Sequence, residues 1–96
     1  MAYKVVVSPR AQKEIENAVE YYALYSNMAP AKFIYSLQEA YVALEIDPYL
    51  RLRYKHIRSI KLKKFPYSLY FLVNEDEKLV RILSCFHDKR NPKSRP

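Results

Sequence analysis

The sequence predicts a single α+β domain over residues 1–96, in which a two-helix hairpin packs on one face of a mostly antiparallel four-stranded sheet, in the order β-α-α-β-β-β. Three observations lead to this prediction. A chain of 96 residues is the size of one compact domain. Apolar residues recur at helical spacing in the first half and change to a period of two in the second half. Half of the residues are hydrophobic and 15% are aromatic, which excludes an intrinsically disordered chain.

The beginning of the chain predicts a short strand followed by a helix. Residues 3–7 form a β-branched run that is typical of a strand. Ser8 can cap the following helix through its hydroxyl, and Pro9 has the fixed backbone geometry that suits a first helical turn. The helix should end near Tyr25. Its apolar face is formed by Ala11, Ile15, Val19 and Tyr22.

A second helix is predicted between two prolines. Pro30 suits its first turn, and Pro48 ends it because proline disfavours helical geometry in the preceding residue, Asp47. Only a few residues separate the two predicted helices, so we expect an antiparallel pair. The apolar positions of the second helix are Phe33, Leu37, Ala40 and Leu44, with Ile34 and Tyr41 beside them.

Three strands are predicted in the second half of the chain, at residues 57–62, 67–73 and 79–86, because these segments are rich in β-branched and aromatic residues. Their connections, at 63–66 and 74–77, are short enough for hairpins, and we expect the acidic second connection in solvent. The chain contains no glycine. Its turns should therefore use Asn, Asp and Pro, positive φ angles should be few, and glycine-rich phosphate-binding loops are excluded.

The predicted strand at 67–73 is apolar on both faces, a pattern expected when both faces are covered. Two short helices can cover only one of them. The other face should therefore stay exposed or meet a second chain, since large exposed apolar patches usually mark interaction surfaces. The alternative is that the polar tail at 91–96, which we expect to be frayed, or an edge loop covers it. The two faces carry Tyr67, Leu69, Phe71 and Val73 on one side and Ser68, Tyr70 and Leu72 on the other.

The single cysteine, Cys85, excludes a disulfide scaffold and a thiolate zinc site, and it favours a reducing, cytoplasmic location. The first ten residues lack the features of a signal peptide, and no stretch approaches the roughly 20 apolar residues of a membrane span. Side chains two residues apart on one strand face, as Cys85 and His87 are, stand roughly 6.5–7 Å apart, which is too far for a nucleophile–base pair. We expect Cys85 in the core, and the sequence implies no metal and no cofactor.

Basic residues gather in the second half of the chain. Residues 1–50 carry 4 Lys and Arg against 6 Asp and Glu, whereas residues 51–96 carry 13 against 4. Seven of these cations lie between residues 51 and 64, interleaved with aromatic residues, as in surfaces that bind phosphates and stack bases. A basic surface also serves solubility. Solvated surface positions are the expectation for Lys55, Lys63, Lys64, Lys93 and Arg95.

The end of the last predicted strand can gather a compact cationic site. His87, Lys89 and Arg90 come close together there, and Lys61 can join them from a neighbouring strand. Arg81 lies on the same strand face as His87, but the six residues between them correspond to about 20 Å. Arg81 and His87 therefore cannot bind one phosphate.

The predicted helix pair is followed by Phe-Pro-Tyr at 65–67, an acidic turn, and a closing His-x-x-Arg-Asn-Pro at 87–92. This order of motifs resembles the RelE/ParE superfamily of bacterial type II toxins over nearly the whole chain. The resemblance implies a toxin of the plasmid-stabilisation type, neutralised by a cognate antitoxin whose C-terminal segment wraps over the sheet and helices of the toxin. Such an antitoxin would cover the second face of the sheet.

The resemblance implies two alternative mechanisms. RelE-like members are ribosome-dependent mRNA endonucleases, which need a base or activating cation, stabilisation of the phosphorane and an acid for the leaving oxygen. Lys61 and Arg90 match two residues of that site, and His87 can substitute as the proton donor. However, Ser68 stands where an arginine is expected, and no tyrosine follows Tyr70. ParE-like members, which poison DNA gyrase, need no such cluster and fit better.

We therefore expect a ParE-like toxin that inhibits DNA gyrase, with ribosome-dependent mRNA cleavage or a non-toxic binding module of the same fold as alternatives. The expected partners are a cognate antitoxin and either gyrase or the ribosome with its mRNA, and the chain can self-associate when the antitoxin is absent. Catalytic residues, for the endonuclease alternative only, are Lys61, His87 and Arg90. The residues expected to bind the antitoxin or the target are Arg58, Tyr67, Tyr70, Arg81 and Lys89.

Overall fold

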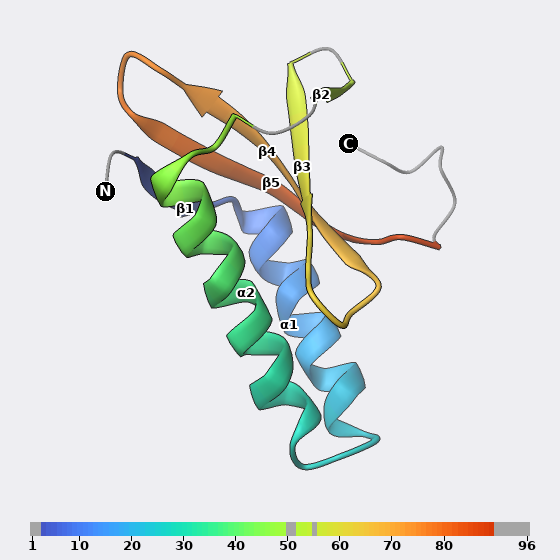
Figure 1. The fold of residues 1–96 in the computed structure, drawn as a ribbon. Helices are drawn as coiled ribbons and strands as arrows, with labels where there is room; N and C mark the ends of the chain where they lie inside the picture. Colours follow the sequence, from blue (N-terminus) through green and yellow to red (C-terminus); the bar gives the residue numbers. More distant parts are fainter. Residues whose placement is uncertain (1–2, 50–51, 55, 90–96) are drawn as a thin grey trace.

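A computed structural model describes residues 3–49, 52–54 and 56–89, and it confirms the predicted α+β architecture (Figure 1). Two helices, α1 (Pro9–Ala23) and α2 (Ala29–Ile46), pack side by side on one face of a sheet. The strands of the sheet follow the order β1-β5-β4-β3-β2. Their bounds are β1 (Lys4–Val7), β2 (Leu52–Tyr54), β3 (Ile57–Lys61), β4 (Tyr67–Asn74) and β5 (Leu79–His87).

The sheet contains one strand more than the prediction. Strand β2 pairs antiparallel with β3 and lies within the basic run at 51–64, where three residues are too few to show a period of two. Strands β3, β4 and β5 form an antiparallel meander, and β1 pairs parallel with β5 at the opposite edge. The sheet is therefore mixed, and its pairings are mostly antiparallel, as predicted. The predicted frayed tail at 91–96 lies outside the described residues.

Helix α1 is fixed to a bulge in β5. The Ser8 hydroxyl caps the helix, as predicted, by accepting a backbone N–H of its first turn at 3.2 Å, and it also donates to the Leu83 carbonyl at 3.1 Å. Leu83 is the extra residue that shifts the β4–β5 register. One turn further along α1, a carboxylate oxygen of Glu14 accepts from the Ser84 hydroxyl (2.7 Å) and the Cys85 N–H (3.0 Å). These bonds satisfy polar groups that the bulge would otherwise leave unpaired.

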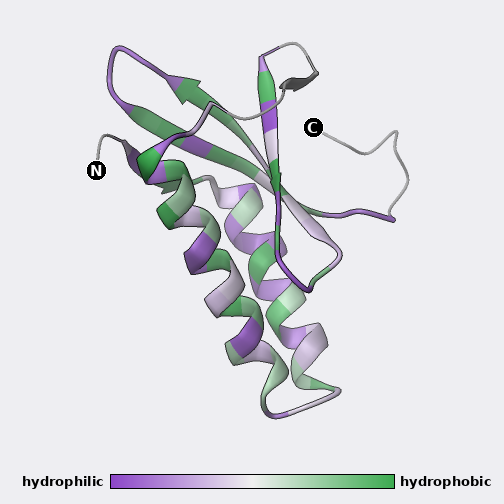
Figure 2. Cartoon of the chain, viewed as in Figure 1, coloured by the Kyte–Doolittle hydropathy of each residue, from purple (hydrophilic) through white to green (hydrophobic). Residues whose placement is uncertain are grey.

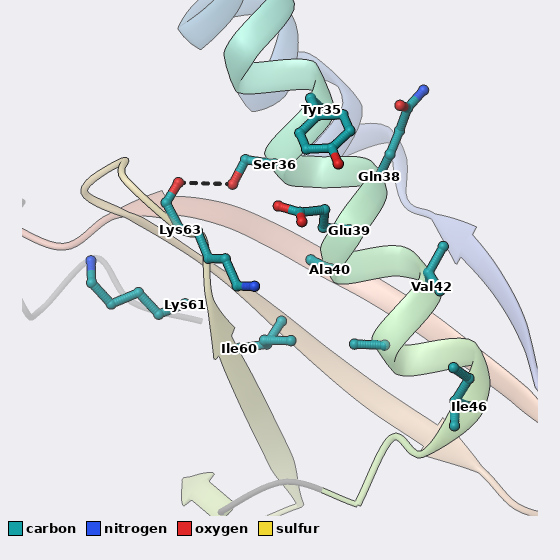
Figure 3. A pocket seen from close by; sticks show the side chains of 11 residues that line it. Tyr35, Ser36, Gln38, Glu39, Ala40, Val42, Ile46, Ile60, Lys61 and Lys63 are labelled. Carbon is teal, nitrogen blue, oxygen red and sulfur yellow. Dashed lines mark hydrogen bonds between the residues drawn. The ribbon is translucent and has the colours of Figure 1, made fainter.

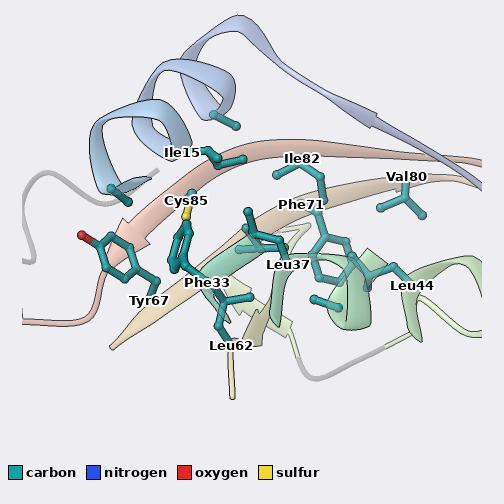
Figure 4. Close-up of a cluster of buried hydrophobic side chains, with 14 residues drawn as sticks. Ile15, Phe33, Leu37, Leu44, Leu62, Tyr67, Phe71, Val80, Ile82 and Cys85 are labelled. Atoms are coloured by element: carbon teal, nitrogen blue, oxygen red, sulfur yellow. The ribbon is translucent and has the colours of Figure 1, made fainter. Parts of the chain in front are cut away.

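The hydrophobic core fills the space between the helix pair and the sheet (Figure 4). The Phe33 ring of α2 is completely buried, and its centroid lies 5.2 Å from that of Phe65 and 5.4 Å from that of Tyr67. Cys85 is buried in this core, which confirms its predicted place. The buried members labelled in Figure 4 are Ile15, Phe33, Leu37, Leu44, Leu62, Tyr67, Phe71, Val80, Ile82 and Cys85.

Around the first half of β4, the face of the sheet opposite the helices is buried within the single chain, so the expectation that this face stays exposed or needs a second chain is wrong there. Ser68, Tyr70 and Phe86 are 5%, 4% and 1% exposed, although they lie outside the core under the helices. Tyr70 and Phe86 pack edge to face across β4 and β5, with 6.3 Å between their ring centroids. Leu72 remains half-buried. The tail at 91–96, which was the alternative cover for this face, lies outside the described residues.

Two residues have positive φ angles in the described part of the chain, and both are lysines: Lys64 (69°) and Lys78 (51°). They lie in the β3–β4 and β4–β5 connections. The prediction that such positions are few is confirmed, but the expected Asn and Asp do not occupy them. Holding a lysine in this left-handed region costs roughly 1 kcal/mol more conformational free energy than holding a glycine there would, so each hairpin is destabilised by about this amount.

The buried ring of Phe33 should dominate the stability of the α2–sheet contact. We expect Phe33→Ala to lower the free energy of unfolding by about 3–5 kcal/mol, because it removes a fully buried aromatic ring and leaves a cavity. Tyr35→Ala, at an exposed position two residues along the same helix, is the matched control. It should change the free energy of unfolding by less than about 1 kcal/mol. Urea unfolding followed by circular dichroism measures both. Equal losses in the two variants would contradict this account of the core.

Candidate functional site

Lys61, Ser68 and Asp88 meet at the end of the sheet where β3 and β5 end and β4 begins. The register places Lys61 opposite Ser68, and Asp88 directly follows β5. Lys61 Nζ donates to Asp88 Oδ2 at 2.5 Å, and Ser68 Oγ donates to Asp88 Oδ1 at 2.7 Å. The backbone N–H of Asp88 also donates to the Pro66 carbonyl at 2.8 Å. The carboxylate therefore binds one side chain from each of two neighbouring strands.

The electrostatics of this cluster favour the ionised carboxylate. Burial by itself would raise the pKa of Asp88, but the hydrogen bonds from Lys61 and Ser68 outweigh burial and hold the pKa below its usual range. Lys61 keeps 65% of its side chain exposed, yet its ammonium already has a paired counter-charge. Lys61 is thus less available to a phosphate than an unpaired lysine would be.

His87 lies on the other face of the sheet from Lys61. The register pairs His87 with Tyr67, which faces the core under the helices, and the two rings meet edge to face at 5.0 Å. The backbone N–H of Lys89 donates to His87 Nδ1 at 3.1 Å, so the neutral imidazole carries its proton on Nε2. Lys61 and His87 thus project from opposite faces of this end of the sheet.

The His87 ring lines a hollow of about 380 Å³ between α1 and β5. Its other lining residues are Glu14, Asn17, Ala18, Tyr21, Tyr67 and Cys85. Within residues 3–49, 52–54 and 56–89, no three His, Cys, Asp or Glu side chains are grouped so that they could hold a metal ion. Across the same described ranges, no helix has the length and apolar character needed to cross a membrane.

Two predicted binding residues are buried. Tyr67 belongs to the core under the helices, and Tyr70 lies on the opposite face of β4. Their exposed fractions are 7% and 4%. Neither side chain presents a surface to a partner while the chain keeps this conformation.

The other predicted binding residues are dispersed over the surface. Arg58 lies with its guanidinium 5.2 Å from the centre of the Tyr49 ring. Arg81 is exposed on β5, and Lys89 is exposed just beyond the end of that strand. Arg90, the third residue of the predicted catalytic set, lies outside the described residues. The described members of the predicted set therefore form no common site.

Besides Glu14, sequence reasoning missed two carboxylates that bind several partners. Asp88 is one, and the only signal for it is an acidic residue that directly follows the last strand. Glu75 is the other: in the turn expected to be simply solvated, it accepts hydrogen bonds from Lys78, Tyr49 and Tyr3. The hydrogen bond from Lys78, followed by that from Tyr3, lowers the pKa of Glu75. These contacts join the β4–β5 turn to segments far away in the sequence.

A groove runs between α2 and the β3–β4 hairpin (Figure 3). It consists of two adjoining hollows of about 550 and 690 Å³, and we call it the α2–β3 groove. The Ser36 hydroxyl donates to the Lys63 carbonyl at 3.0 Å and joins the helix to the hairpin where the hollows meet. Residues common to both hollows are Tyr35, Ser36, Glu39 and Lys63. Most of the exposed lining surface is apolar.

Large exposed hydrophobic side chains lie on the helices and the segments that adjoin them. Figure 2 shows hydrophobic residues along both helices as far as the turn that joins them. The exposed residues are Tyr21, Leu24, Tyr25, Met28, Ile34, Tyr35, Val42, Ile46 and Tyr49. The apolar surface available to partners is therefore on the helical layer rather than on the far face of the sheet.

Residues 5–92 match the model of a protein family described as the ParE toxin of the type II toxin–antitoxin system parDE. The chain belongs to this ParE toxin family. The match covers most of the chain and confirms the superfamily that the motifs at 65–67 and 87–92 indicate. Comparison with curated protein sequences gives no match.

Solved structures of related toxins share the fold of this ParE-family toxin. The chromosomal ParDE system of P. aeruginosa matches with 15% identity and a TM-score of 0.65, covering 90% of this chain and 96% of the other. The intact E. coli RelBE complex matches with 22% identity and a TM-score of 0.66, covering 93% of this chain and 100% of the other. The RelBE2 complex of M. tuberculosis matches with 17% identity and a TM-score of 0.63, covering 91% and 99%. ParE-type and RelE-type toxins thus share this fold, and the fold does not separate them.

The Asp88 cluster of this ParE-family toxin should contribute to stability in a pH-dependent way. We expect Asp88→Asn to lower the free energy of unfolding by about 1 kcal/mol at pH 7, because Lys61 and Ser68 lose a charged acceptor. A carboxyl whose pKa is lowered by folding stabilises the protein above its unfolded pKa of about 3.9, and this contribution is lost as the pH falls through the folded value.

Urea unfolding of wild type and Asp88→Asn between pH 3 and pH 7 measures this contribution. The difference in the free energy of unfolding between wild type and Asp88→Asn should stay constant down to about pH 5 and shrink below about pH 4. Asp76→Asn, in the exposed β4–β5 turn, is the matched control and should leave the stability unchanged. A difference for Asp88→Asn that is the same at pH 3 and pH 7 would show that the charge of the carboxylate is not what stabilises the cluster.

Proposed function

We propose that this ParE-family toxin inhibits DNA gyrase when it is free and that an antitoxin neutralises it by occupying the α2–β3 groove. The observation that supports inhibition of gyrase is the pairing of Lys61 with Asp88, while His87 lies on the opposite face of the sheet. Cleavage of RNA by general acid–base catalysis needs its cation and its proton donor within reach of the same phosphate. An arrangement that separates them supports a toxin that acts by binding.

The position of Ser68 also supports this proposal. The endonuclease branch implied by the sequence resemblance has an arginine there, which would stabilise the phosphorane. Here Ser68 is 5% exposed, and its hydroxyl donates to Asp88. A buried serine whose hydroxyl is already hydrogen-bonded supplies no positive charge to a transition state. The match to the ParE family model is consistent with the same conclusion.

The α2–β3 groove supports the second part of the proposal. The neighbours from P. aeruginosa, E. coli and M. tuberculosis include toxin–antitoxin complexes. Along the groove, Tyr35, Val42 and Ile46 are exposed on α2. Lys32 and Lys64 line the hollow nearer the helix turn. A long apolar strip with lysines beside it suits an amphipathic antitoxin segment that carries acidic residues on its polar face.

The target can be tested by inducing the toxin alone in bacteria and measuring the incorporation of labelled thymidine and of labelled amino acid over the first minutes. The proposal predicts that thymidine incorporation falls first. Lys61→Gln and His87→Ala should retain this effect at equal protein levels, because neither side chain acts as a catalyst.

Earlier loss of amino-acid incorporation, abolished by Lys61→Gln, would instead establish the ribosome-dependent endonuclease. If neither incorporation changes while the protein accumulates in folded form, the chain is a non-toxic binding module. Both outcomes would overturn gyrase inhibition.

The antitoxin site can be tested with two variants that each place a carboxylate on an exposed apolar position. Val42→Glu, in the groove, should weaken binding of the antitoxin at least tenfold, because it buries an unpaired charge in the interface. Leu24→Glu, in the turn between the helices, is the matched control and should bind like wild type. Titration calorimetry measures both affinities. Weakened binding in Leu24→Glu with normal binding in Val42→Glu would place the antitoxin elsewhere.

A further inference from the structure

The turn between α1 and α2 presents an apolar surface that lies outside the lining of the α2–β3 groove. Tyr21, Leu24, Tyr25 and Met28 are 49%, 83%, 70% and 62% exposed, and we call these four side chains the apolar tip. The tip lies at the end of the helix hairpin, away from the sheet (Figure 1). All eleven residues from 21 to 31 are uncharged. Exposed apolar patches of this kind usually mark interaction surfaces.

The apolar tip is held in place by local contacts. The ring of Tyr21 lies 5.0 Å from that of Tyr25 and 5.4 Å from that of Tyr22, which reaches into the core. The Tyr25 N–H donates to the Tyr22 carbonyl at 3.1 Å, and the Met28 N–H donates to the Ser26 hydroxyl at 3.0 Å. Because the two tyrosine rings contact each other and the turn is hydrogen-bonded, these parts of the tip lose little conformational entropy on association.

Two opposite charges flank the apolar tip. Glu20 precedes Leu24 by about one turn in α1, and Lys32 follows Met28 by about one turn in α2. Both side chains are exposed, and neither forms an ion pair within the described part of the chain. In a two-fold arrangement, Glu20 of one copy can meet Lys32 of the other, and the pair occurs twice. The surface is therefore complementary to itself.

The size of the tip indicates how strong such an association can be. Side chains of this type present roughly 150–250 Å² each, so the four exposed fractions correspond to roughly 500 Å². A stable interface takes about 800 Å² from each partner, which the tip approaches once its flanking charges are included. We propose that two copies of this chain associate reversibly through the apolar tip, with Glu20–Lys32 pairs on both sides. This proposal does not depend on the identity of the toxin's target.

Sedimentation equilibrium of the purified full-length chain at about 1–100 µM tests the proposal. Wild type should change from monomer to dimer with a Kd of the order of 10 µM. Leu24→Glu should stay monomeric throughout this range, whereas Val42→Glu, at an exposed apolar position in the groove, should dimerise like wild type. Circular dichroism establishes that each variant is folded. A wild type that is monomeric at 100 µM, or a dimer that survives Leu24→Glu, would overturn the proposal.

Charge exchange tests the two-fold geometry. Glu20→Lys and Lys32→Glu should each weaken the dimer roughly tenfold, because each replaces two attractions with two repulsions. The double variant Glu20→Lys/Lys32→Glu should dimerise like wild type, since the exchange restores opposite charges across the interface. A double variant that is no tighter than the single variants would overturn the proposed pairing of Glu20 with Lys32.

Discussion

Burial of β4 on both of its faces is the constraint on which the rest of the structure depends. On one face, Leu69 and Phe71 pack beneath the helix pair. On the other face, Tyr70 is covered within the same chain. Because neither face of the central sheet is free at this point, the apolar surface left for partners lies on the helices. The α2–β3 groove and the apolar tip are two separate parts of that surface, and each can serve a different partner.

The same burial explains how the polar groups at this end of the sheet are arranged. Ser68 projects from β4 into a nearly closed environment, where its hydroxyl needs a partner, and Asp88 supplies it. The ionised carboxylate then holds Lys61 on the neighbouring strand. His87, one residue before Asp88, lies beside Tyr67 on the helix side of the sheet. Lys61 and His87 therefore project from opposite faces of the sheet at this strand end.

The sequence predicts local structure well because local structure is determined by neighbouring residues. Ser8-Pro9 and Pro30 place the starts of both helices, and alternating apolar residues place β3, β4 and β5. Strand β2 is too short to show a period, so it could not be predicted. The bulge at Leu83 reverses the alternation along β5, so the expectation that Arg81 and His87 share a strand face is wrong. The sequence hides this shift because Ile82 and Leu83 are both apolar. The contact between Lys61 and Asp88 joins residues 27 positions apart, and no local pattern indicates it. Burial of Tyr70 likewise depends on how distant segments pack.

The action proposed for this ParE-family toxin is inhibition of gyrase by binding rather than cleavage of RNA. The most direct measurement uses purified components: gyrase, relaxed plasmid DNA and ATP, with the toxin added at stoichiometric amounts and no ribosome or RNA present. A toxin that inhibits gyrase by binding should prevent supercoiling, Lys61→Gln should prevent it equally, and prior addition of the antitoxin should restore it. Normal supercoiling with folded toxin in excess over gyrase would contradict the claim.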